Sequence, residues 1–121
     1  MRIISIVFIG SLMASPALSD TAVSGFGARE CKFLNAHTRP GNGWSENALT
    51  QSVMSWVQGF VSGVNVLKMG EEKKFFDLSA ISVDEQWTFI VTYCRRNPTK
   101  LISHAADDLI FRRLVEKQIS K

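Results

Sequence analysis

The sequence predicts an all-α protein, a small four-helix orthogonal bundle with one disulfide, which follows a cleaved signal peptide. Three observations predict this class. The chain of 121 residues begins with a short apolar segment typical of an export signal, its remainder carries apolar residues at helical spacing, and it contains only two cysteines. Alternating runs of β-branched residues bounded by hairpin turns do not occur, and neither does an internal repeat.

The N-terminal segment has the three parts of a secretory signal. Arg2 supplies a positive charge, residues 3–13 are an almost unbroken apolar run, and Pro16 precedes the small residues Ala17 and Ser19. This run is about half of the roughly 20 residues that a membrane-spanning helix needs. We therefore expect cleavage after Ser19, no stable membrane anchor, and a single helical domain over 20–121 in the periplasm.

The charge of the mature chain is small. Loss of Arg2 leaves 13 Lys and Arg against 11 Asp and Glu, a net charge of +2. The basic doublets at 73–74, 95–96 and 112–113 are separated along the chain and form no single basic patch. Nucleic acid is therefore not an expected partner.

The two cysteines, Cys31 and Cys94, both remain after cleavage. In an exported chain an even number of cysteines favours a disulfide. Closing a loop of about 64 residues stabilises a fold by about 4 kcal/mol in the chain-entropy model. The alternatives are free or intermolecular thiols, and a metal site with His37 and His104, whose spacing does not match a zinc finger. We expect no bound metal and no cofactor.

The first elements of the mature chain are short. Residues 20–27 are small and polar, and we expect a loose arm. A short helix is predicted over 28–36, with Cys31 and Leu34 on one side, and the turn-forming residues 38–43 end it.

The central helix has the clearest pattern in the chain. Ser45 is predicted to be its N-cap, with Trp44 and Leu49 placed to form a hydrophobic staple. Apolar or small residues then recur at spacings of three and four, and we expect this stripe to face the core. Its members are Leu49, Val53, Trp56, Phe60, Gly63 and Leu67.

Gly59 and Gly63, with Ser55 one turn earlier, form a ridge of small residues on this helix. Such a ridge allows close approach of another backbone. We prefer close packing by another helix of the same domain; a ligand, a homodimer or a partner protein is the alternative. Gln51 and Gln58 make the helix too polar to span a membrane.

A surface loop is predicted over 68–80. Its Phe75 and Phe76 are expected to pack on the core, or else to be presented to a partner.

Two helices follow this loop. Ser82 and Glu85 form a capping box, and the helix that they begin ends at Asn97-Pro98. We expect Asn97 to cap the last helix directly, with Pro98 at its first position and a C-terminal end that frays. The core-facing residues of this last helix are expected to be Leu101, Ala105, Leu109 and Ile110.

Catalytic motifs are absent from the sequence. It has no nucleophile elbow, no HExxH, no phosphate-binding glycine loop and no catalytic-cysteine context. His104 is expected to be a partly exposed structural residue and His37 a solvated one. We therefore expect a function in binding and not in catalysis.

Three segments resemble the periplasmic HdeA/HdeB acid-stress chaperones. Residues 82–101, which contain the run YCRRNP, resemble the region of the family's second cysteine. Residues 30–34 are similar to its first-cysteine segment, and residues 56–60 to its central Trp/Gly helix. The resemblance implies a small helical protein in which Cys31 and Cys94 form the one disulfide.

The same resemblance implies an ATP-independent holdase, often dimeric at neutral pH, that exposes apolar surface in acid and binds unfolded proteins. Trp56, Phe60 and Val64, with Phe75 and Phe76, would be the client-binding residues. Near pH 2 the 13 basic residues and two His would bring the mature charge to +15, so self-repulsion would favour opening.

The sequence also resembles Tai-type immunity proteins, which neutralise secreted effector toxins in the periplasm. The shared features are the glycine-rich central helix and the Cys-Asn-Pro-like region around Cys94. This family usually has a second cysteine pair, which is missing here. Neutralisation of an effector is therefore the alternative function.

Overall fold

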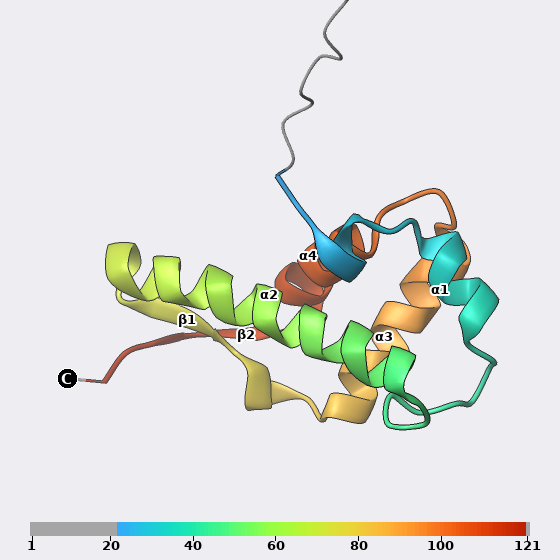
Figure 1. The fold of residues 1–121 in the computed structure, drawn as a ribbon. Coiled ribbons are helices and arrows are strands. Elements are labelled where there is room, and N and C mark those ends of the chain that lie inside the picture. Colours follow the sequence, from blue (N-terminus) through green and yellow to red (C-terminus); the bar gives the residue numbers. More distant parts are fainter. Residues whose placement is uncertain (1–21, 121) are drawn as a thin grey trace, which may run out of the picture.

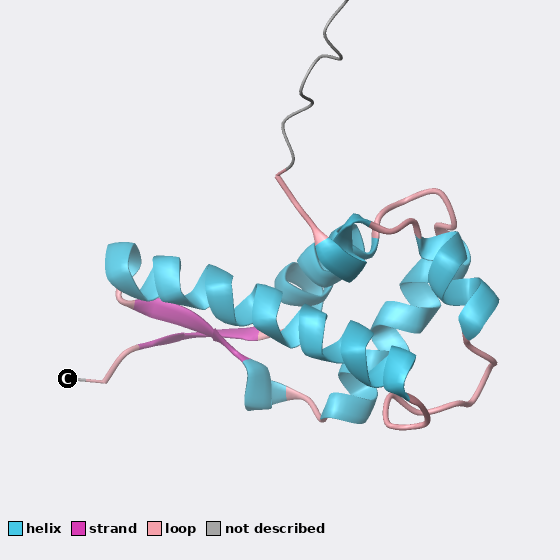
Figure 2. Ribbon diagram, viewed as in Figure 1, coloured by secondary structure: helices cyan, strands magenta, loops and turns pink. Residues whose placement is uncertain are grey.

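The computed structural model describes residues 22–120, so the predicted signal peptide, 1–19, lies outside the described residues (Figure 1). The described residues are mostly helical, with one small sheet (Figure 2). In chain order the elements are η1 (Gly25–Ala28), α1 (Cys31–His37), α2 (Ala48–Glu72), β1 (Lys74–Asp77), η2 (Leu78–Ala80), α3 (Val83–Arg96), α4 (Ile102–Arg113) and β2 (Val115–Gln118).

Helix α2 is the longest element, and η1, β1 and α4 pack against it, whereas α1 packs on α3 (Figure 1). Asn47 is its N-cap: the Asn47 side chain accepts a hydrogen bond from the Thr50 N–H at 3.0 Å, and the Thr50 hydroxyl accepts one from the Asn47 N–H at 3.2 Å. The prediction of Ser45 as N-cap was therefore wrong by two residues. The helix ends at Lys73, which has a left-handed backbone with φ of 57°.

Strands β1 and β2 form a two-stranded antiparallel sheet, in which Phe75 is opposite Lys117. The prediction of helices alone was wrong here, as were the surface loop over 68–80 and the fraying C-terminus. Asn65 of α2 holds β1 in place. Its side-chain amide donates to the Phe76 carbonyl at 2.8 Å, and its side-chain oxygen accepts from the Phe76 N–H at 2.7 Å.

The described part of the predicted loose arm 20–27, residues 22–27, packs against α2 and is not loose, whereas residues 20 and 21 lie outside the described residues. The indole N–H of Trp56 donates to the Ser24 carbonyl at 3.0 Å. Gly27 of η1 is buried under the same ring, where a Cβ atom would lie 1.9 Å from a ring carbon. Only glycine fits at this close approach.

Helix α3 begins as predicted, because the Ser82 hydroxyl accepts a hydrogen bond from the Glu85 N–H at 3.1 Å. Helix α4 begins at Ile102 and is not capped by Asn97, so that prediction was wrong. The ring of His104 instead accepts a hydrogen bond from the Leu101 N–H at 3.1 Å. Residues 97–101 form a link that reaches back to α1.

The core lies between α2 and helices α1, α3 and α4. On α2 its buried residues are Thr50, Val53, Met54, Val57 and Val61. On the other helices, fully buried side chains include Leu34, Ile90, Ile102, Ala105, Ala106, Leu109 and Ile110. Of the stripe predicted on α2, only Val53 is buried, and Leu67 is 68% exposed. The buried face of α2 therefore differs from the predicted face by a rotation of about 100° around the helix axis. This is the angle between successive residues of an α-helix.

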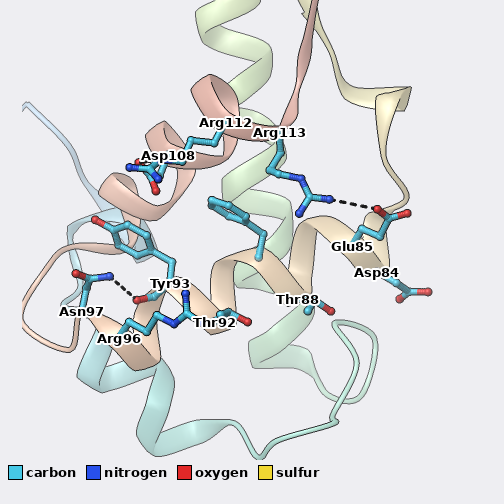
Figure 3. Close-up of a pocket in the computed structure, with 11 residues that line it drawn as sticks. Asp84, Glu85, Thr88, Thr92, Tyr93, Arg96, Asn97, Asp108, Arg112 and Arg113 are labelled. Carbon is cyan, nitrogen blue, oxygen red and sulfur yellow. Dashed lines mark hydrogen bonds and ion pairs between the residues drawn. The ribbon is translucent and has the colours of Figure 1, made fainter.

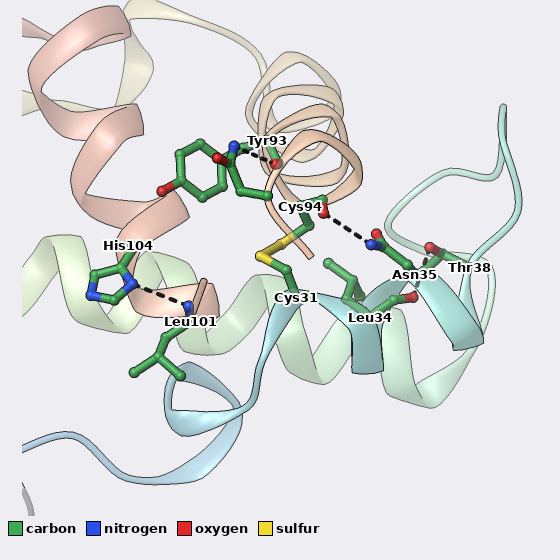
Figure 4. Close-up of a disulfide and its surroundings, with 9 residues drawn as sticks. Cys31, Leu34, Asn35, Thr38, Tyr93, Cys94, Leu101 and His104 are labelled. Atoms are coloured by element: carbon green, nitrogen blue, oxygen red, sulfur yellow. Dashed lines mark hydrogen bonds between the residues drawn. A yellow bond between two sulfur atoms is a disulfide. The ribbon is translucent and has the colours of Figure 1, made fainter. Parts of the chain in front are cut away.

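Cys31 and Cys94 form the disulfide, and both are fully buried (Figure 4). It joins the start of α1 to the end of α3. The Asn35 side chain supports the same contact by donating to the Cys94 carbonyl at 2.9 Å. The Cys31 N–H also donates to the Lys100 carbonyl at 2.7 Å, so the link before α4 is held to α1 as well.

Candidate protein-binding surface

The partner-binding residues predicted on α2 border the core without filling it. The rings of Trp56 and Phe60 stack with their centroids 5.3 Å apart. Trp56, Phe60 and Val64 are all half-buried. They lie at successive turns, between the core and the opposite side of the helix.

The side of α2 that faces away from the core consists mostly of Ser and Gly. The exposed positions on this side, which we call the outer face of α2, are Ser52, Ser55, Gly59, Ser62, Gly63, Val66 and Gly70. Trp56, Phe60 and Leu67 border the outer face on one side, and Met69 borders it on the other. Val66 and Leu67 are 70% and 68% exposed.

No element of the described chain covers Gly59 and Gly63. A Cβ atom added at either glycine would meet no other atom within 4 Å. The preferred prediction, close packing by another helix of the same domain, is therefore wrong for residues 22–120. A mid-helix glycine lowers stability by about 1 kcal/mol relative to alanine, and no contact in this part of the chain offsets that cost.

The outer face also lacks charge, because no Asp, Glu, Lys or Arg occurs between Glu46 and Lys68. A solvent-facing helix surface normally carries charged residues, whereas the centres of protein–protein interfaces are depleted of them. Among the described helices, none is both long and apolar enough to cross a bilayer. The outer face of α2 thus has the composition of a protein-contact surface.

Phe75 and Phe76, also predicted to bind a partner, lie on β1. Phe76 belongs to the core and packs edge-on against Phe111, with ring centroids 5.9 Å apart. Phe75 is half-buried. Of this pair, Phe76 is therefore not available to a partner in the folded chain.

Ion pairs tie the sheet together and to the end of α2. Lys117 of β2 pairs with Asp77 of β1, and Lys68 of α2 pairs with Glu72 and, at 3.5 Å, with Glu116 of β2. The hydrogen bond from Lys117 lowers the pKa of Asp77 from 3.8 to about 2. The hydrogen bond from Lys68 likewise lowers the pKa of Glu72. We call these contacts the strand ion pairs.

A cleft of about 710 Å³ lies between α3 and α4 (Figure 3). Phe89 and Tyr93 line it from α3, and Arg113 of α4 lies 3.5 Å from Glu85 of α3. Burial raises the pKa of Tyr93, and the nearby Asp108 raises it further. This cleft could not be predicted from the sequence, because its lining residues are spread over 84–113 and match no motif.

The histidines have local structural contacts. His37 is exposed, and its ring lies 2.8 Å from the Phe33 carbonyl. His104 is exposed, and its ring accepts a hydrogen bond from the Leu101 N–H at the start of its own helix. The disulfide rules out a metal site made from both cysteines, and within residues 22–120 no three His, Cys, Asp or Glu side chains gather to hold a metal ion.

Comparison with known proteins found no matching protein-family model, no matching curated protein and no matching solved structure. The function is therefore argued from the geometry of the surface.

Proposed function

We propose that the chain is an exported, non-catalytic domain that binds a partner protein through the outer face of α2 while it is folded. The observation that carries the proposal is the exposed and uncharged outer face, bordered by Trp56, Phe60 and Leu67. Burial of apolar area contributes roughly 25 cal/mol per Å². Gly59 and Gly63 have no side chain, so a partner's backbone can come close to the helix, which increases the area buried.

The partner that best fits this surface is a folded, secreted effector protein, as in the Tai-type immunity proteins that the sequence resembles. Such a partner is bound at neutral pH by the folded chain. The outer face supports this mode because Val66 and Leu67 are exposed without any unfolding. A holdase activated by acid would instead keep its binding surface covered at neutral pH.

The test is complex formation with the secreted protein encoded beside this chain's gene. At pH 7 we expect a stoichiometric complex in size-exclusion chromatography and a saturable titration in calorimetry. Leu67→Ser is expected to weaken binding about tenfold, the size of a moderate interface contact. Val115→Ser removes an exposed apolar residue from β2 and serves as the matched control. The proposal would be contradicted if no complex forms, or if Leu67→Ser and Val115→Ser lose the same amount of binding affinity.

A second candidate function is the acid-activated holdase of the HdeA/HdeB kind, and the strand ion pairs favour it. Lys117 with Asp77 joins β2 to β1, and Lys68 with Glu116 joins β2 to α2, and both ion pairs need an ionised carboxylate. Protonation of Asp77 and Glu116 would free β2 and uncover Phe76 and Leu114, which are both buried in the folded chain. The disulfide would still join α1 to α3.

The two candidates predict different pH dependences. A holdase suppresses aggregation of an unfolded client near pH 2–3 and is inactive at pH 7. The folded-state binder forms its complex at pH 7 and needs no acid. Aggregation suppression in acid together with no neutral-pH complex would replace the first function by the second.

A further inference from the structure

We propose that the cleft between α3 and α4 is a second binding site, which takes an extended peptide segment of a partner protein with an acidic residue at one end and a basic residue at the other. None of the outer-face residues of α2 lines this cleft, so the inference goes beyond the proposed function.

The middle of the cleft is suited to apolar contact. Phe89 and Tyr93 are one turn apart on α3, are half-buried and line the cleft. Thr88 and Thr92 of the same helix also line it, and Figure 3 labels them together with Tyr93. The volume of about 710 Å³ lies within the range of roughly 300–1,000 Å³ that ligand sites occupy. An apolar side chain of a ligand can therefore pack here.

The two ends of the cleft carry charges of opposite sign that have no ion-pair partner in the described part of the chain. Arg113 is paired with Glu85, and Arg112 lies 3.2 Å from Asp108, so these four charges balance one another. Arg96, at the C-terminal end of α3, has no ion-pair partner among the described residues, and neither has Asp84 at the other end.

The separation of these charges fits a peptide. Arg96 and Asp84 are twelve positions apart on one helix, which is an axial separation of about 18 Å at 1.5 Å per residue. An extended chain advances about 3.3 Å per residue, so five or six steps, and therefore six or seven residues, span this distance. A carboxylate against Arg96, a Lys or Arg against Asp84 and an apolar residue between them match the cleft, whereas a compact small molecule reaches only one end.

The test uses Tyr93, which is the only tyrosine of the chain and lies in the cleft. Labelling with ¹³C-tyrosine therefore places one set of ring NMR signals at the site. The probe is the capped peptide acetyl-Glu-Val-Leu-Thr-Val-Thr-Lys-amide, whose Glu, Leu and Lys side chains share one face when it is extended, titrated into the oxidised full chain at pH 7 and low salt. We expect a saturable shift of the Tyr93 ring signals.

Two arginine variants distinguish a direct contact between Arg96 and the peptide from a general effect of the protein's net charge. Arg96→Glu replaces an attraction by a repulsion at an exposed site and is expected to weaken binding about five-fold. Arg95→Glu changes the net charge equally, but Arg95 borders a different hollow, so binding is expected to change less than two-fold. A peptide with Lys in place of its Glu should bind Arg96→Glu better than it binds the native chain.

Several results would overturn the proposal. These are the lack of a saturable Tyr93 shift at millimolar peptide, equal effects of the two variants, or no gain from the charge-reversed peptide. If Arg96→Glu lowers the melting temperature and leaves peptide binding unchanged, Arg96 only stabilises the C-terminal end of α3, where the helix dipole is negative, and the proposal also fails. None of these results bears on complex formation through the outer face of α2.

Discussion

Replacing the glycines of the outer face is expected to stabilise the free chain. Gly59 and Gly63 are mid-helix, and an added Cβ atom would meet no atom within 4 Å at either position. Alanine at such a site restricts the unfolded chain and favours the helix, which contributes about 0.5–1 kcal/mol per substitution. Gly59→Ala and Gly63→Ala together should therefore add about 1–2 kcal/mol to the free energy of unfolding.

The assay is thermal unfolding followed by circular dichroism on the oxidised protein at pH 7. For a domain of this size, 1 kcal/mol shifts the melting temperature by about 4–8 °C, so the double variant should melt at least about 4 °C higher. Gly27→Ala is the opposing control. Its Cβ atom would lie 1.9 Å from the Trp56 ring, so the same substitution should cost about 1–3 kcal/mol by overpacking.

A lower melting temperature for Gly59→Ala or Gly63→Ala would refute the reasoning. It would mean that something covers the outer face in the free protein, and a melting temperature that rises with protein concentration would identify a second copy. If the outer face binds a partner, the double variant should also lose affinity while it gains stability, because the new methyl groups keep the partner's backbone away.

Three further predictions concern the disulfide, the strand ion pairs and the core. Cys94→Ser should cost about 4 kcal/mol in the chain-entropy model and lower the melting temperature by more than about 15 °C without reductant, whereas unchanged melting would show that the disulfide is not stabilising. Because the pKa of Asp77 is lowered to about 2, its stabilisation is present above its ordinary pKa of 3.8 and is lost as the pH falls through about 2. Asp77→Asn should therefore melt at a lower temperature than the native chain at pH 7, and it should lose less stability than the native chain between pH 4 and 2. If the melting temperatures of the two proteins instead fall in parallel with pH, the ion pair between Asp77 and Lys117 is contradicted. Leu109→Ala in the core should lower the free energy of unfolding by about 2–5 kcal/mol, measured by chemical denaturation, and Leu67→Ala should lower it by less than about 0.5 kcal/mol. Similar losses in the two variants would contradict the assignment of Leu109 to the core and of Leu67 to the exposed side of α2.

The parts of the fold with strong local signals could be predicted from the sequence. Ser82 with Glu85 marks the start of α3, and the helix ends at the predicted position before Asn97. The disulfide followed from the number of cysteines and the expected export. Each of these features depends on residue type or on neighbours within one turn.

The core-facing side of α2 could not be predicted correctly. The helix is apolar or small on more than half of its circumference and has no charged residue before Lys68 to mark the solvent side. A stripe through Trp56 and Phe60 and one through Val53, Val57 and Val61 have equally regular spacings. Only the packing of the other helices decides between them.

The sheet and the cleft depend on contacts between distant segments. A strand of four residues shows no periodicity that distinguishes it from a loop, and β1 pairs with a strand about 40 residues later. The cleft likewise forms only when α3 and α4 pack together. Arg96 and Asp84, which have no ion-pair partner within residues 22–120, do not stand out in the sequence, because basic residues at a helix end and acidic ones at a helix start are common.

The most direct test of the central claim is a map of backbone amide NMR signals during titration with the neighbouring secreted protein at pH 7. If the folded chain binds through the outer face of α2, the signals that change will be those from Ser52 to Gly70 on that side of the helix, while the buried residues Ile90 and Leu109 stay unchanged. No binding at pH 7, or changes confined to other elements, would contradict the claim.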